Sequence, residues 1–141
     1  MTTTARAALH VDASRERVWH ALTDPDTISR FMFGTRVETD WREGSPIRYR
    51  GEWEGRPYED KGTILEIVPG DRLVTSYYSP LSGKSDEPAS YQTVSYFLAD
   101  DGDGTLVTIT QDGCADDAEA ERMSGNWSAV LASLKSVVEE D

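Results

Sequence analysis

The sequence contains few of the side chains that bind metals or form disulfides. Of its 141 residues, Cys114 is the only cysteine, and His10 and His20 are the only histidines. One cysteine cannot form an internal disulfide, and these three side chains are too few for a typical zinc site. We therefore expect no metal centre and no cofactor, and a chain without disulfides fits a reducing cytoplasm.

Basic residues and long apolar runs are also scarce. Lysine and arginine total 14 against 26 acidic residues, so the formal net charge is −12. This charge repels nucleic-acid phosphates and anionic lipid surfaces, which argues against both as partners, and it serves either solubility or attraction to a basic protein surface. With no apolar run of about 18 residues and no signal-peptide pattern, the sequence predicts neither a membrane span nor secretion.

The apolar residues that are present predict a long helix over about residues 116–140. Asp116 is placed to cap its start, with Glu119 completing a capping box. Gly125 lies inside the helix at a cost of about 1 kcal/mol relative to alanine, and we interpret it as allowing a close approach, a bend or room for an indole. The opposite face is small and weakly polar, as expected for a solvent face or, alternatively, a helix-mediated dimer, so the oligomeric state stays open. One stripe at helical spacing contains Met123, Trp127, Val130, Leu131, Leu134, Val137 and Val138.

The remaining chain predicts seven strands and two short helices. A first strand over 4–11 precedes one helix capped at Asp12 or Ser14 and a second helix running from Asp24 to Gly34. The period then changes to two, and short turns favour antiparallel neighbours. The fold class is therefore α+β, with one domain over 1–141 in which a bent antiparallel sheet grips the long helix. The six later strands are expected at about 35–40, 45–54, 57–68, 72–79, 90–99 and 104–112.

Four segments resemble the START-like superfamily, also called SRPBCC. Residues 11–32 (VDASRERVWHALTDPDTISRFM) resemble its opening strand and helices, and residues 62–77 (GTILEIVPGDRLVTSY) its central hairpin. Residues 104–113 (GTLVTITQDG) resemble its last strand, and residues 125–140 (GNWSAVLASLKSVVEE) its final helix. The nearest branch is similar to the C-terminal domain of the activators of heat-shock protein 90 ATPase. The resemblance implies a helix-grip fold: a curved sheet of about seven strands, two short helices after the first, and a long C-terminal helix across the concave face.

The chain also departs from the superfamily pattern at three places. The usual Gly-Trp pair is separated by one residue in Gly125–Trp127, and the double glycine expected before the third strand is missing from residues 43–46. A tryptophan often found at the end of the second helix is replaced within residues 31–33. These changes alter the expected pocket entrance, so the identity of a ligand cannot be transferred from relatives.

Aromatic residues are the candidates for ligand binding. We expect them to line the space between sheet and helix, with Trp53 and Trp127 on opposing walls. Large rings with polar tips can surround an apolar ligand and leave a hydroxyl or an indole N–H to orient it, whereas the alternative is a simple core. The candidates are Phe31 and Phe33 at the mouth, then Tyr49, Trp53, Tyr77, Tyr96 and Trp127.

No catalytic residue is predicted. His10 and His20 have no matched carboxylate or cysteine at a suitable spacing, and Cys114 has no basic neighbour in the sequence to activate its thiol. Asp60 and Glu66 could act as general acids or bases if they faced a cavity, but an exposed edge position is the favoured interpretation.

Three functions are compatible with these features. The first is a binding module that holds a small hydrophobic ligand under the long helix. The second, implied by the resemblance, is association with a chaperone, although the chain has no room for the additional N-terminal domain that full ATPase activation would require. The third is a cyclase or hydrolase that uses the same cavity, which the absence of a catalytic constellation makes the least favoured.

Overall fold

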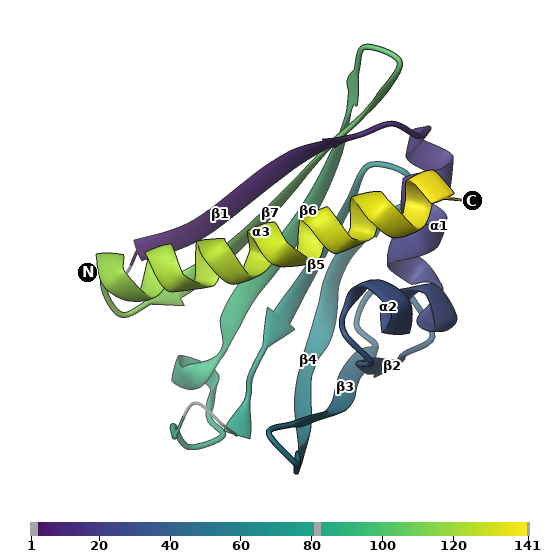
Figure 1. Cartoon of the computed structure of the whole chain (residues 1–141). Helices are drawn as coiled ribbons and strands as arrows, with labels where there is room; N and C mark the ends of the chain where they lie inside the picture. The colour runs from purple at the N-terminus through teal and green to yellow at the C-terminus, as the bar shows by residue number, and fades with distance from the viewer. Residues whose placement is uncertain (1–2, 81–82, 141) are drawn as a thin grey trace.

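The computed structural model describes residues 3–80 and 83–140, with the side chain of Trp53 outside the description. Within these residues one strand, two helices, six strands and a long helix follow in the predicted order (Figure 1). The helices are α1 (Arg15–Thr23), α2 (Pro25–Phe31) and α3 (Asp117–Glu140), with a short 3-10 turn at Pro88–Ser90. The strands are β1 (Thr3–Val11), β2 (Arg36–Glu38), β3 (Pro46–Trp53), β4 (Arg56–Val68), β5 (Arg72–Tyr77), β6 (Gln92–Asp101) and β7 (Gly104–Cys114).

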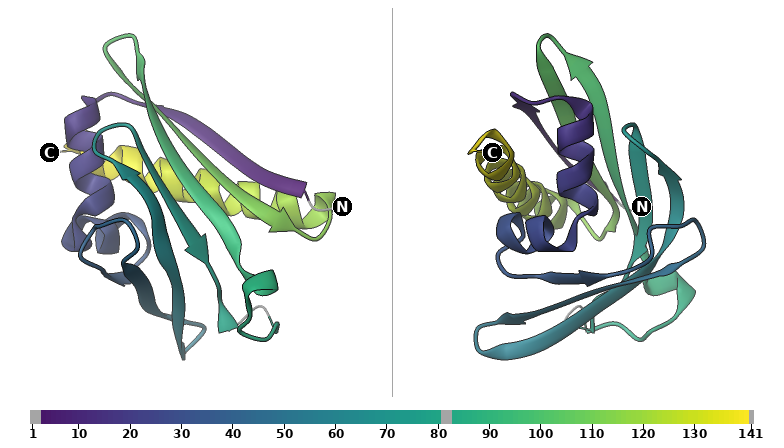
Figure 2. Two further views of the ribbon diagram at one scale, coloured as in Figure 1. Left: turned by 180° about the vertical axis from the view of Figure 1, so that it is seen from behind. Right: turned by 90° about the vertical axis from the view of Figure 1, so that its right-hand side faces the viewer.

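The seven strands form one antiparallel sheet in the order β1-β7-β6-β5-β4-β3-β2. The first strand therefore pairs with the last, and β1 and β2 lie at the two edges. The sheet is strongly curved but stays open, with the helices on its concave side (Figure 2). This arrangement confirms the predicted α+β helix-grip fold.

Capping side chains define where each helix begins. Ser14, rather than Asp12, caps α1, Asp24 caps α2 and Asp116 caps α3. Each accepts a hydrogen bond from the backbone N–H three residues later, at 3.2, 3.2 and 2.8 Å respectively. The carboxylate of Glu119 accepts a further backbone N–H at 3.1 Å. These bonds satisfy donors that a first helical turn leaves unpaired.

The long helix α3 packs along β1 and over the concave side of the sheet (Figure 1). Leu131, Leu134 and Val138 are buried on its inner side, as the stripe predicts. They join a core that includes residues of α1 and α2, such as Val18 and Phe31. In the described part of the chain, neither α3 nor any shorter helix has the length and apolar character needed to cross a membrane.

The glycine inside α3 has a different role from the one predicted. Gly125 is exposed, and a Cβ built on it would meet nothing within 4 Å. The interpretation that it permits close packing or makes room for the neighbouring indole is therefore wrong. At this position glycine only weakens the helix, because it adds conformational freedom to the unfolded chain.

Close packing by glycine occurs instead in the sheet. A Cβ on Gly62 of β4 would lie 1.8 Å from the carbonyl oxygen of Ser76 on β5, so no other residue fits without moving the backbone. Two residues later the register shifts between Ile64 and Glu66, which leaves Leu65 as an extra residue in β4. Such bulges increase local bending and twist. The close crossing at Gly62 and the bulge at Leu65 together favour bending of the sheet at β4 and β5.

Candidate functional site

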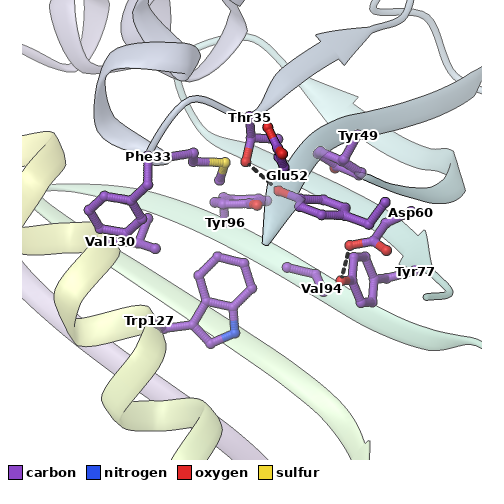
Figure 3. Close-up of a pocket in the computed structure, with 12 residues that line it drawn as sticks. Phe33, Thr35, Tyr49, Glu52, Asp60, Tyr77, Val94, Tyr96, Trp127 and Val130 are labelled. Atoms are coloured by element: carbon purple, nitrogen blue, oxygen red, sulfur yellow. Dashed lines mark hydrogen bonds between the residues drawn. The ribbon is translucent and has the colours of Figure 1, made fainter. Parts of the chain in front are cut away.

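A cavity of about 280 Å³ lies between the sheet, the turn after α2 and the helix α3 (Figure 3). Six of its twelve lining residues have aromatic rings, two are carboxylic acids and none is basic. The lining comprises Met32, Phe33 and Thr35 after α2, Tyr49 and Glu52 of β3, Tyr58 and Asp60 of β4, Tyr77 of β5, Val94 and Tyr96 of β6, and Trp127 and Val130 of α3. Six separate segments therefore build its wall.

The fold brings together five of the seven aromatic residues singled out in the sequence. Phe31 does not line the cavity, because its ring is only 1 % exposed and belongs to the core. Trp53 ends β3, and since its side chain is not described, its placement opposite Trp127 stays a prediction. The five that line the cavity are Phe33, Tyr49, Tyr77, Tyr96 and Trp127.

Asp60 is the residue of this site that the sequence interpretation placed wrongly. It is 8 % exposed and lines the cavity instead of lying at an exposed edge. Its Oδ2 accepts a hydrogen bond of 2.6 Å from the hydroxyl of Tyr77 (Figure 3). Its Oδ1 is buried without a hydrogen-bond partner among the described residues. The signal was present in β4, where Tyr58, Asp60, Gly62 and Ile64 alternate with residues of the opposite face.

Two tyrosines surround this carboxylate. The rings of Tyr49 and Tyr77 lie 6.2 Å apart and are tilted by 60°. Burial raises the pKa of Tyr49 to about 12, and the negative charge of Asp60 acts in the same direction. Burial, followed by the charge of Asp60 and the hydrogen bond to it, also raises the pKa of Tyr77. Both phenols are therefore neutral at physiological pH and act as polar tips on an apolar wall.

The indole of Trp127 forms the opposite wall, but its N–H is already occupied. It donates to Oε1 of the buried Gln111 at 2.8 Å, and the amide of Gln111 donates to Gln92 at 2.7 Å. The ring stands edge-on to Tyr96, with centroids 6.1 Å apart and planes at 86°. Trp127 therefore offers a ligand its apolar surface, whereas the expectation that its N–H is free to orient a ligand is wrong.

The mouth of the cavity is formed by the turn between α2 and β2. Phe33 is 71 % exposed and adopts a positive φ of 56°, a backbone conformation that is uncommon for a bulky side chain. In Figure 3 its ring extends toward Val130 of α3. Behind it, the hydroxyls of Thr35 and Tyr58 are hydrogen-bonded at 2.8 Å. The ring of Tyr58 crosses Gly51, where a Cβ would approach its hydroxyl to 2.5 Å.

The other titratable residues considered from the sequence lie away from the cavity. His10 is bonded to Asp101 at 2.8 Å on the protein surface. Cys114 is fully buried beside α3, and burial raises the pKa of its thiol, which opposes nucleophilic reactivity. Glu66 is partly exposed and pairs with Arg72. None of these side chains can act on a molecule held in the cavity.

The sequence is matched by the model of one protein family. The model of the family described as activator of Hsp90 ATPase homolog 1-like protein matches residues 12–139. The chain belongs to this family. Membership confirms the resemblance noted in the sequence. The START-type fold of this family is compatible with ligand binding. A search of curated proteins gave no match.

Solved structures support the same assignment. ChR145 from Cytophaga hutchinsonii is 40 % identical, with a TM-score of 0.85, over 98 % of this chain and 94 % of that chain. CV1439 from Chromobacterium violaceum is 25 % identical, with a TM-score of 0.78, over 98 % of both chains. DynU16, from the dynemicin biosynthetic locus, is 20 % identical, with a TM-score of 0.79, over 96 % of this chain but 47 % of that chain. At that identity the similarity to DynU16 concerns the fold alone.

Proposed function

We propose that this protein is a binding module that holds a small, largely apolar molecule between the sheet and α3. The observation that carries the proposal is the cavity of about 280 Å³ with six aromatic rings in its lining. Pockets for small molecules typically have volumes from about 300 Å³ upward and combine apolar walls with a few polar groups. The volume therefore fits a compact ligand, and Phe33 gives it an apolar edge at the mouth.

The arrangement favours binding over catalysis. Asp60 is the only buried carboxylate in the lining, and its neighbours Tyr49 and Tyr77 are neutral phenols. General acid–base chemistry usually needs a group that exchanges its proton near the working pH and a second group placed to complete the transfer. The described lining supplies one carboxylate and aromatic surface, which suit recognition better than a reaction.

Filling the cavity tests this proposal directly. Val130→Phe adds a ring to the wall, whereas the matched Ala129→Phe adds the same ring on the exposed side of α3. Small molecules retained by each purified protein are measured by native mass spectrometry, and a retained ligand is then titrated back while melting temperature is recorded. We expect binding by the unaltered protein and Ala129→Phe, with stabilisation of about 2.7 kcal/mol at a hundredfold excess over Kd. We expect none for Val130→Phe, and equal binding by both variants would refute the cavity as the site.

The family match supports a second candidate, association with an Hsp90-type chaperone. With a net charge of −12, such an association would rest on attraction to a basic surface and would weaken with added salt. The test is a pull-down with the chaperone's middle region at low and high salt. Val130→Phe should leave this association unchanged, because it alters the cavity and not the acidic surface. Absence of association at low salt would eliminate this candidate for the chain.

A further inference from the structure

The lining of the cavity has an unbalanced charge. It contains the carboxylic acids Asp60 and Glu52 but no lysine, arginine or histidine. Asp60 is 8 % exposed, and within the described residues no basic side chain lies within 4.0 Å of its oxygens, the distance of an ion pair. A buried carboxylate is normally paired, because removing its charge from water is costly. The partner that would compensate this charge is absent from the wall itself.

The hydrogen bonds around Asp60 also show that its carboxylate lacks a full set of partners in the described wall. Tyr77 donates to Oδ2, while Oδ1 is buried and has no partner among the described residues. The indole N–H of Trp127 is used by Gln111. The buried carboxylate thus keeps acceptor capacity, and the only donor that reaches it from the described wall is one phenol. A ligand that supplies further donors complements this wall better than one that supplies acceptors.

Aromatic rings complete the environment. Tyr49 and Tyr77 flank the carboxylate, and Tyr96 and Trp127 form the edge-on pair across the cavity (Figure 3). The faces of such rings carry partial negative charge and attract organic cations, most strongly where water is excluded. A carboxylate among aromatic rings therefore combines two features that favour a substituted ammonium group and disfavour a carboxylate or phosphate.

From these features we infer that the cavity selects an organic cation: a protonated amine attached to a compact apolar body. The ammonium group pairs with Asp60, and the apolar body lies against Trp127, Val130 and Phe33. This inference rests on the proposed binding function and names the chemical class of its ligand. Anionic molecules of the same size and shape are excluded by Asp60 and Glu52.

Three probes with the same carbon skeleton and head groups of different charge test the inference. They are 4-phenylbutylamine, 4-phenylbutan-1-ol and 4-phenylbutanoate, which share one apolar body and are cationic, neutral and anionic at pH 7. Affinities are measured by isothermal titration calorimetry with the unaltered protein. We expect the amine to bind at least about tenfold more tightly than the alcohol, as a desolvated charge pair with a cation–π contribution allows, and the carboxylate to bind most weakly.

Two matched variants test whether the preference for the amine depends on Asp60. Asp60→Asn keeps the size of the side chain and an acceptor for Tyr77, and it should reduce amine affinity to that of the alcohol while leaving alcohol affinity within about threefold. Glu59→Gln removes the same charge from the exposed opposite face of β4, and it should preserve the ranking. If Asp60→Asn fails to fold, the ranking with the unaltered protein decides alone.

The outcomes separate this inference from the function on which it rests. Equal affinity for the amine and the alcohol in the unaltered protein would overturn the cation preference and leave the binding module intact. An amine preference that survives in Asp60→Asn would overturn the role of Asp60. If none of the three probes bound, the proposed binding function would fail together with the inference.

Discussion

Two stretches of the interface between α3 and the sheet differ in how completely they are filled. Toward the C-terminal end, Leu131, Leu134 and Val138 are buried against a core to which α1 and α2 contribute. Near the middle of α3, Trp127 and Val130 are only partly buried and border the cavity, whereas Ala120, nearer the N-terminus, is again buried with Ala5 and Cys114. The same helix and sheet form both regions. The comparison shows that the apolar stripe of α3 does not by itself determine where side chains close on the sheet and where a cavity remains.

The largest expected effect is in the closed region. Leu134 is 0 % exposed, so Leu134→Ala should lower the free energy of unfolding by about 2–5 kcal/mol through lost contacts and a new void. Val130→Ala, one turn earlier at the cavity wall, should cost less than about 1 kcal/mol because the side chain already borders empty space. Urea denaturation measures both values. Similar losses would show that the two regions are equally packed and would remove the basis of the comparison.

A smaller loss is expected from the polar contact at the cavity wall. Trp127→Phe removes the donor to Gln111, a buried residue, and should cost about 1–3 kcal/mol for the acceptor left unpaired. Trp19→Phe is the matched control, because its indole packs against the closed core and makes no hydrogen bond like this one with any of the described residues. Thermal melts of both variants give the difference. If the two cost the same, the Gln111 contact does not stabilise the wall.

Alkaline pH should lower the free energy of unfolding through Tyr49, which lines the cavity. The pKa of Tyr49 is about 12 in the fold and 10.0 ordinarily, so the folded state holds this proton more tightly. Its contribution is complete below pH 10, and on the order of 1 kcal/mol should be lost as the pH rises toward 12. Melts of the unaltered protein and Tyr49→Phe between these values measure it. A constant stability difference across the range would contradict the raised pKa.

The smallest effect is a gain in stability on the solvent side of α3. Gly125→Ala should raise the free energy of unfolding by about 0.5–1 kcal/mol, because its Cβ has open space and alanine favours the helix. Ala129→Gly, one turn later on the exposed side, should lower it by a similar amount. Neither change should alter ligand affinity. A destabilised Gly125→Ala protein would indicate a contact at this face, such as a second copy of the chain.

Much of the fold was predictable because its signals are local. The caps at Ser14, Asp24 and Asp116 and the turns between the strands depend on neighbouring residues, and the strand and helix order follows from them. The bulge at Leu65 was not predictable, because a shift of register depends on the partner strand.

The candidate site was predictable only in part. The aromatic candidates were found because rings in strands are usually buried, but whether a ring joins the core, as Phe31 does, depends on the position of α1 and α2. Asp60 was considered, but it was placed at an exposed edge for a different reason. Its place in the alternation of β4 indicated the inner face, while the general preference of carboxylates for water indicated the outer one. The alternation predicted the position of Asp60 correctly, and the preference of carboxylates for water did not. Residues that depart from such a general preference are expected at functional sites.

The pairing of β1 with β7 also has a consequence for how the chain folds. Thr3 lies opposite Cys114, and α3 then packs along the same edge strand. Contacts between segments so distant in sequence give a fold a high contact order, which slows the search for the native state. On the ribosome, β1 must wait for more than a hundred residues of synthesis before its partner emerges. Until then β1 is unpaired and the edge of β6 that β7 later covers is open, which makes this interval the stage most prone to association between nascent chains.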